Sequence, residues 1–214
     1  MSAPYRSAPW FQAVLLGLFA CLAAVLLAGG DEATREDIKA RKAEDLVASL
    51  SQVIPPESHD NNLLADTLSV TTGDGDTRTV YQAIRAERVV AVAYMVVGQG
   101  YAGPVEVLMG VDESGTVLGA RVLAHAETPG LGDKIERAKD DWIDSFAGQS
   151  FDTLPEGRWK VKKDGGVFDQ FSGATITPRA VVQAVKGGLD FFHARRDELL
   201  TIPDAAPDPE NQES

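Results

Sequence analysis

Residues 80–124, VYQAIRAERVVAVAYMVVGQGYAGPVEVLMGVDESGTVLGARVLA, decide the fold of this chain. Four runs within this stretch, VYQAIRA, VVAVAYMVV, VEVLMGV and TVLGARVLA, are rich in β-branched and other apolar residues. Glycine, proline and acidic residues separate the runs, as turns separate consecutive strands. We therefore expect these residues to form one antiparallel sheet.

A glycine-rich segment joins the second run to the third. Gly98, Gly100 and Gly103 match the spacing G-x-G-x-x-G, which binds dinucleotides when a helix opens directly after it. Here strand-like residues that begin with Pro104 follow instead. The segment is therefore predicted to be a turn between strands.

Helical periodicity is present after the sheet region. From Pro178 onward, apolar residues recur at intervals of four, four and three: Val181, Val185, Leu189 and Phe192. This pattern predicts the buried stripe of a long helix. Shorter helices are expected over residues 131–138 and 140–146. A sheet followed by separate helices predicts an α+β fold.

A further helix is expected before the sheet, over residues 34–53. Thr34 followed by Asp37 resembles a capping box at its start, and Pro55 and Pro56 would end it. The short segment from Leu64 to Val70 shows no decisive pattern.

The N-terminal stretch WFQAVLLGLFACLAAVLLAG, residues 10–29, carries no charge. Twenty helical residues at about 1.5 Å each match a hydrocarbon core of about 30 Å, so we expect a single transmembrane helix. The alternative is a cleaved signal peptide, because small residues precede Asp31. Basic residues follow the span more often than they precede it, so charge counting leaves the orientation open.

These patterns divide the chain into five parts. They are a short tail, a transmembrane helix, an amphipathic helix with a connecting region, one folded domain and a disordered polar tail: residues 1–9, 10–29, 30–78, 79–200 and 201–214.

Composition excludes several classes of function. The chain of 214 residues carries 32 acidic and 20 basic residues, a net charge of −12, and no basic patch, so nucleic-acid binding is not expected. Cys21 is the one cysteine and lies in the apolar run, so no internal disulfide or thiolate metal site is possible. His59, His125 and His193 are far apart in sequence, and no metal site is expected.

The segment DQFSGATITP, Asp169–Pro178, carries the chemistry. Thr177 as N-cap and Pro178 as first residue predict a helix start, where free amides and the helix dipole favour an anion. Gly173 and Ala174 would let a ligand approach the backbone, and Thr175 offers a hydroxyl at that place. Read by itself, the segment is also compatible with an ordinary capped turn.

Two motifs resemble the FMN-binding domain family. The pattern D-x-x-S-G-A-T, Asp169–Thr175, resembles its flavinylation sequence, in which a flavin transferase joins the FMN phosphate to the last threonine. HAETPGLGDKIE, residues 125–136, resembles the second signature of the family, a loop beside the flavin. Its alternative interpretation is a connection in which Pro129 and Gly130 only supply turn geometry.

The likeness extends over most of the chain and is greatest to the G subunits of Rnf electron-transport complexes. The C subunits of sodium-pumping NADH:quinone oxidoreductases are similar in plan. Ser172 departs mildly from the pattern, because many Rnf sequences have threonine there. The resemblance implies one FMN-binding domain with covalent FMN on Thr175. It also implies cofactor-binding roles for these residues: Ser172, Gly173, Ala174, Thr177, Glu127, Thr128, Gly130 and Leu131.

Of these, Glu127, Thr128, Gly130 and Leu131 would line the isoalloxazine ring. Arg179 and Lys134 are candidate partners of the phosphate, whose remaining negative charge the helix start would stabilise.

The resemblance also implies the function. Such a protein carries electrons within a complex that couples ferredoxin and NAD redox chemistry to Na⁺ or H⁺ transport, and it catalyses nothing alone. Its partners would be the other membrane and iron–sulfur subunits, and a flavin transferase during maturation. The expected location is the bacterial inner membrane, with the domain in the periplasm. Two alternatives stay open: an FMN-binding domain acting outside such a complex, and a structural subunit with unmodified Thr175.

Overall fold

The computed structural model describes residues 9–72, 75 and 77–202, and the chain divides into two compact units, Met1–Asp45 and Leu46–Ser214. Residues 1–8 of the expected N-terminal tail and residues 203–214 of the expected C-terminal tail lie outside the described residues. In the first unit, Pro9–Asp31 is long and apolar enough to cross a membrane, with a mean hydropathy of 2.5. The expected apolar N-terminal helix is therefore confirmed.

The apolar segment and the expected amphipathic helix belong to one element, α1 (Pro9–Val53). The prediction of a separate helix start at Thr34 was wrong. The Thr34 hydroxyl instead donates to the carbonyl of Gly30 at 2.9 Å, four residues earlier, as threonines inside helices do. The helix ends at Val53, before Pro55 and the 3-10 turn η2 (Pro56–Ser58), as the prolines indicate.

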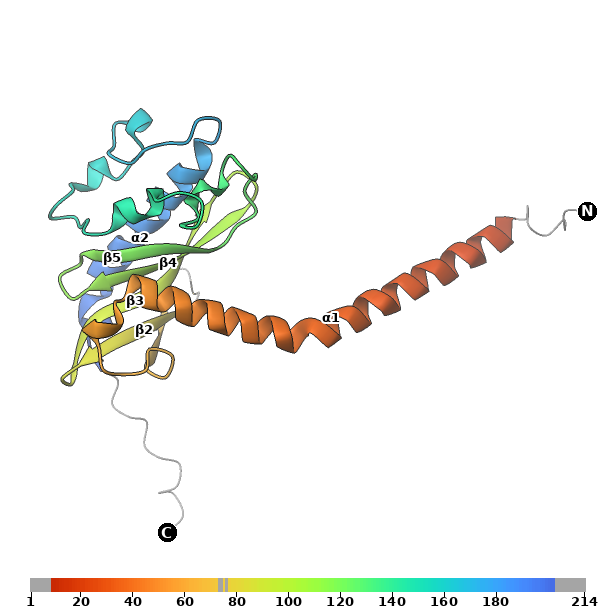
Figure 1. Cartoon of the computed structure of the whole chain (residues 1–214), viewed down its shortest axis with the longest axis horizontal. Coiled ribbons are helices and arrows are strands. Elements are labelled where there is room, and N and C mark those ends of the chain that lie inside the picture. The colour runs from red at the N-terminus through yellow and green to blue at the C-terminus, as the bar shows by residue number, and fades with distance from the viewer. Residues whose placement is uncertain (1–8, 73–74, 76, 203–214) are drawn as a thin grey trace, which may run out of the picture. The chain divides into compact units, whose positions relative to one another are not determined.

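Five strands form one sheet in the second unit (Figure 1). They are β1 (Thr67–Thr71), β2 (Thr77–Arg85), β3 (Arg88–Gln99), β4 (Pro104–Asp112) and β5 (Val117–Ala124). Their order in the sheet is their order in sequence, and every neighbouring pair is antiparallel. The α+β class and the antiparallel sheet are therefore confirmed, and β1 is the strand that the sequence left unassigned.

Both faces of the sheet are covered, because the central strands bury side chains in alternation. On one face Val92 and Tyr94 of β3 belong to the larger core with the C-terminal helix. On the other face Ala91 and Ala93 pack with Leu50 at the end of α1. The period of two residues in strands puts successive side chains on opposite faces, so a strand buried on both faces reads as a continuous apolar run.

The C-terminal helix α2 (Ile176–Leu199) lies along β3 and β4. The predicted stripe of Val181, Val185, Leu189 and Phe192 is confirmed, because all four side chains are fully buried. The Tyr94 hydroxyl donates to the carbonyl of Gly188 at 2.9 Å and ties strand to helix. A Cβ on Gly98 would come within 2.5 Å of the carbonyl oxygen of Ala180. Glycine at position 98 therefore permits the close approach of α2 to β3.

The glycine-rich segment is the turn between β3 and β4, as predicted. The N–H of Gly100 donates to the carbonyl of Gly103 at 2.9 Å, and β4 follows directly at Pro104. The element that opens on this turn is thus a strand, where a dinucleotide site would have a helix.

Between β5 and α2 the chain forms short 3-10 turns, η3 (Asp133–Ile135), η4 (Trp142–Phe146), η5 (Glu156–Arg158) and η6 (Lys162–Asp164). Short helices were predicted over 131–138 and 140–146, and the structure has the 3-10 turns η3 and η4 within these ranges, so the predicted helices were too long. Segments this short cannot offset the cost of helix nucleation, so tertiary packing sets their conformation. An aromatic cluster supplies that packing: Trp142, Phe146, Trp159, Phe168 and Phe171.

Candidate cofactor-binding site

A pocket of about 530 Å³ lies where three segments meet. The β3–β4 turn, the loop after β5 and the start of α2 supply its lining: Tyr101, Glu127, Thr128, Leu131, Gly132, Gly173, Ala174, Thr175, Ile176 and Thr177. The structure thus brings together most of the residues that the sequence singled out for cofactor binding. Gly130 and Ser172 belong to the same two loops but do not line the pocket.

A tight turn leads into the helix start. The N–H of Ala174 donates to the carbonyl of Phe171 at 3.2 Å, and Gly173 has a φ of 82°. This left-handed conformation suits glycine, which has no Cβ to clash. The turn delivers Thr175 to the N-terminal end of α2.

The helix begins two residues earlier than predicted. Thr175 occupies the N-cap position, although its side chain makes no capping hydrogen bond, and Ile176 is the first helical residue. Thr177 is fully buried, and its hydroxyl donates to Oε2 of Glu127. The prediction of Thr177 as N-cap was therefore wrong, because a buried carboxylate accepts from the hydroxyl that the sequence assigned to a cap.

This geometry leaves the Thr175 side chain at the positive end of a helix of 24 residues. The amides of Ile176 and Thr177 have no acceptor within the helix, because the first N–H groups of any helix lack one. An anionic group on the Thr175 oxygen would meet these amides and the helix dipole.

The loop after β5 forms the opposite wall. The N–H groups of Leu131 and Gly132 both donate to the carbonyl of Thr128 at 3.1 Å, and Gly130 has a φ of 78°. The Leu131 side chain is 44% exposed and lines the pocket, so it offers apolar surface that a planar ring would cover.

Glu127 is 5% exposed, and both of its carboxylate oxygens are engaged by the protein. Oε1 accepts from the N–H of Ala102 at 3.0 Å, and Oε2 accepts from the hydroxyl of Thr177. Glu127 therefore lines the pocket while its carboxylate joins the β3–β4 turn to α2.

Comparison with known proteins identifies the family to which this chain belongs. The FMN-binding domain family matches residues 100–190, which contain every residue of the pocket lining. The G subunit of the ion-translocating oxidoreductase complex of Cereibacter sphaeroides is 53% identical over 196 residues, covering 92% of this chain and 90% of the relative. The chain belongs to the family of G subunits of ion-translocating oxidoreductase complexes. The family named from the sequence is thereby confirmed.

A second relative agrees with this assignment. The corresponding G subunit of Stutzerimonas stutzeri is 44% identical over 203 residues, covering 95% of this chain and 89% of the relative. Among solved structures, the crystal structure of Shewanella oneidensis NqrC has a TM-score of 0.46 and 23% identity over 69% of this chain and 71% of that chain.

Four residues that the resemblance implicated, Arg179, Lys134, Asp169 and Ser172, do not line this pocket. Arg179 donates two hydrogen bonds to Asp164, at 2.6 and 2.9 Å, and its guanidinium lowers the pKa of that carboxyl. Lys134, Asp169 and Ser172 line a separate hollow of about 520 Å³. The Asp169 carboxylate, part of the flavinylation motif, pairs there with Lys162 at 2.6 Å.

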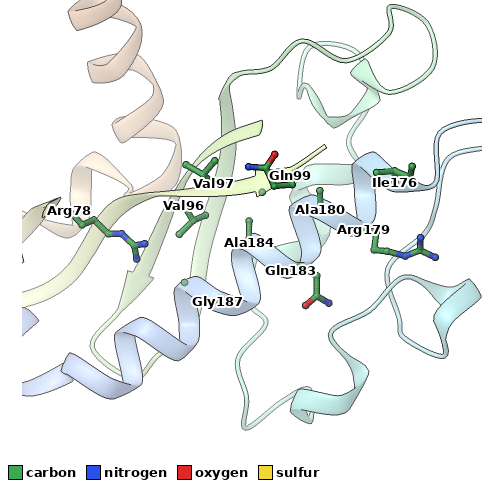
Figure 2. A pocket seen from close by; sticks show the side chains of 12 residues that line it. Arg78, Val96, Val97, Gln99, Ile176, Arg179, Ala180, Gln183, Ala184 and Gly187 are labelled. Atoms are coloured by element: carbon green, nitrogen blue, oxygen red, sulfur yellow. The ribbon is translucent and has the colours of Figure 1, made fainter. Parts of the chain in front are cut away.

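A second hollow of about 480 Å³ adjoins the pocket and shares Ile176 with it. Figure 2 shows Gln99 at the end of β3 beside Ile176 and Ala180 in the first turns of α2. Sequence reasoning missed Tyr101, Gly132 and Ile176 as pocket residues. The signal for Tyr101 was an aromatic residue in a glycine-rich turn, and the structure leaves its side chain 73% exposed.

No cluster of three or more potential metal ligands gathers among the described residues. The polar groups that line the pocket are hydroxyls, backbone amides and the carboxylate of Glu127.

An ion-pair network lies behind the loop after β5. Nε2 of His125 lies 2.8 Å from Oε1 of Glu136, and Nζ of Lys139 lies 2.6 Å from the same oxygen and 2.9 Å from Oδ2 of Asp133. Lys139 and, more weakly, His125 hold the pKa of Glu136 below its usual range. Nδ1 of His125 accepts from the N–H of Glu127, so the network continues to the pocket wall.

The ion pairs of Glu136 should break at a lower pH in the wild type than in Lys139→Met. A carboxyl whose folded-state pKa is lowered contributes stability above its unfolded pKa of about 4.3, and loses that contribution as pH falls through the folded value. Without Lys139 the folded pKa of Glu136 rises toward the unfolded value, and less stability remains to be lost. Thermal unfolding followed from pH 7 to pH 3 should show a smaller acid-dependent loss in the variant. Equal pH profiles would rule out this contribution.

Proposed function

We propose that this chain is an electron-carrier subunit that holds FMN through a phosphoester bond to Thr175. One observation carries the proposal: the Thr175 side chain stands uncapped at the positive end of α2 and on the wall of a pocket of about 530 Å³. In the phosphoester, the threonine oxygen loses its proton and replaces one hydroxyl of the FMN phosphate, so the product has the mass of the protein plus FMN minus water.

The residues present fit a flavin. The pocket volume lies within the range of about 300–1,000 Å³ that is usual for cofactor sites. Tyr101, Leu131 and Ile176 expose apolar surface around it, which the ring would cover. At the other end, the start of α2 would stabilise the phosphoester charge by about 0.3–1 kcal/mol. FMN, when bound, supplies the redox chemistry, and the protein supplies attachment and orientation.

Attachment suits a carrier at an aqueous face. A covalent bond keeps the flavin on the protein in either redox state. We assign the domain no catalysis on its own.

The relatives named as G subunits of ion-translocating oxidoreductase complexes support a place in such a complex. We propose that residues 10–29 anchor the protein in the inner membrane, and that residues 79–200 form the FMN-binding domain on the periplasmic side. Electrons would pass between it and other membrane and iron–sulfur subunits, with transport of Na⁺ or H⁺. A flavin transferase would attach the cofactor.

Mass spectrometry of the peptide that contains Thr175 tests the proposal directly. Protein purified from a host with a flavin transferase should show that peptide heavier by the mass of FMN minus water. Colourless protein with an unmodified peptide would contradict the electron-carrier role. Flavin fluorescence in a denaturing gel gives an independent measurement of the covalent bond.

A further inference from the structure

The carboxylate of Glu127 is the point where the walls of the pocket are joined. Oε1 accepts from Ala102 in the β3–β4 turn, and Oε2 accepts from Thr177 in the first turn of α2. Tyr101 precedes Ala102, and Thr175 lies two residues before Thr177. One buried side chain thus connects the segment carrying Tyr101 to the segment carrying Thr175.

The surroundings are shaped to contain this carboxylate. A Cβ on Gly132 would lie 3.0 Å from Oε2 of Glu127 and 3.0 Å from Oγ1 of Thr177. A Cβ on Gly100 would collide with Oε1 of Glu127. Both glycines therefore leave room for the side chain, one from each loop that borders the pocket.

The position of this carboxylate also bears on its charge. Oε2 lies beside the start of α2, whose dipole favours a negative charge there. A fixed negative charge in the pocket wall opposes the addition of an electron to a ring held there.

We infer that Glu127 is a positioning residue for the flavin. It acts through Thr177 and the backbone of Ala102, holds Thr175 in place for attachment, and lowers the reduction potential of the bound ring by its charge. This inference rests on the proposed function, because it needs FMN on Thr175.

Two substitutions of Glu127 separate the effect of its hydrogen bonds from the effect of its negative charge. Glu127→Gln keeps both contacts, since its amide oxygen can accept from Ala102 and its amide nitrogen can donate to the Thr177 hydroxyl. Glu127→Leu has a similar size and keeps neither. Thr177→Val and Thr177→Ser form a second pair, which removes or retains the hydroxyl at the other end of the contact.

The experiment uses the full chain, produced with a flavin transferase. It measures the modified fraction of the Thr175 peptide over time, the midpoint potential of the flavin, and folding by circular dichroism. We expect Glu127→Gln and Thr177→Ser to be modified at the wild-type rate. Glu127→Leu and Thr177→Val should be modified at roughly one tenth of that rate or less, because small misplacements of a reacting group are costly. The flavin of Glu127→Gln should have a more positive potential than that of the wild type.

The outcomes are distinguishable. An unmodified wild-type peptide contradicts the proposed function itself. If the wild type is modified, and folded Glu127→Leu is modified at the same rate, then Glu127 does not hold Thr175 in place for attachment. If Glu127→Leu fails to fold, the comparison of Thr177→Val with Thr177→Ser tests the same role: equal rates of modification in these two variants would overturn it. An unchanged or lower potential in Glu127→Gln overturns the role of the charge.

Discussion

Thr175→Val is expected to lose covalent flavin completely while the domain remains folded. Valine replaces the hydroxyl with a methyl group of similar size, so it removes the one atom that can form the phosphoester. The Thr175 side chain makes no capping hydrogen bond, so the start of α2 does not depend on its oxygen. Flavin fluorescence in a denaturing gel and the mass of the peptide measure the loss.

Thr175→Ser is the matched control. It keeps a hydroxyl at the same place and should keep the attached flavin. Acid-stable flavin on Thr175→Val, at Ser172 or elsewhere, would refute the assignment of the attachment residue. Circular dichroism of the valine variant should match that of the wild type.

The second large effect is expected from Trp159→Ala, which should lower the free energy of unfolding by about 3–5 kcal/mol. The Trp159 side chain is fully buried, lies 5.5 Å from Phe168 and 5.8 Å from Phe151 between ring centroids, and donates to the carbonyl of Leu154 at 3.0 Å. Its removal leaves a cavity beneath loops that have no regular helix or strand to hold them. Thermal unfolding should shift downward by roughly 2–4 °C for each kcal/mol.

Trp159→Phe serves as the control, because it keeps an aromatic ring and loses the hydrogen bond to Leu154. Its loss should be clearly smaller than that of the alanine variant. A Trp159→Ala protein with an unchanged unfolding temperature would show that the cluster does not hold these loops.

The parts of the fold that the sequence predicts well are those with a regular period. The runs of residues 80–124 alternate with turn residues, and they form strands where expected. The stripe from Val181 to Phe192 is buried along its length. In both cases local pattern and tertiary packing favour the same structure, so the pattern alone is sufficient.

Prediction failed where a side chain had two possible partners. Thr34 and Thr177 both resemble helix caps in sequence, yet one bonds to a carbonyl inside α1 and the other to Glu127. The choice depends on an acceptor that is distant in sequence or on the continuity of a helix, and neither is visible locally. Likewise, the loops of residues 125–175 are set by aromatic packing between turns, which has no sequence period.

The two sequence motifs predicted two of the segments that line the pocket, but they did not predict the third segment, the β3–β4 turn. The segments around Glu127 and Thr175 were identified separately, and the structure places them at one pocket. Tyr101 belongs to neither motif, and its place at the pocket is set by the fold of the β3–β4 turn.

Each strand of the sheet pairs with the next in sequence, so closing those hairpins orders only short stretches of chain. The contact of Tyr94 with Gly188 instead joins residues 94 positions apart. Contacts of such separation cost more chain entropy to close. A nascent chain can therefore complete its meander before α2 docks. A modifying enzyme that requires the finished pocket would then act only on chains whose folding has been completed.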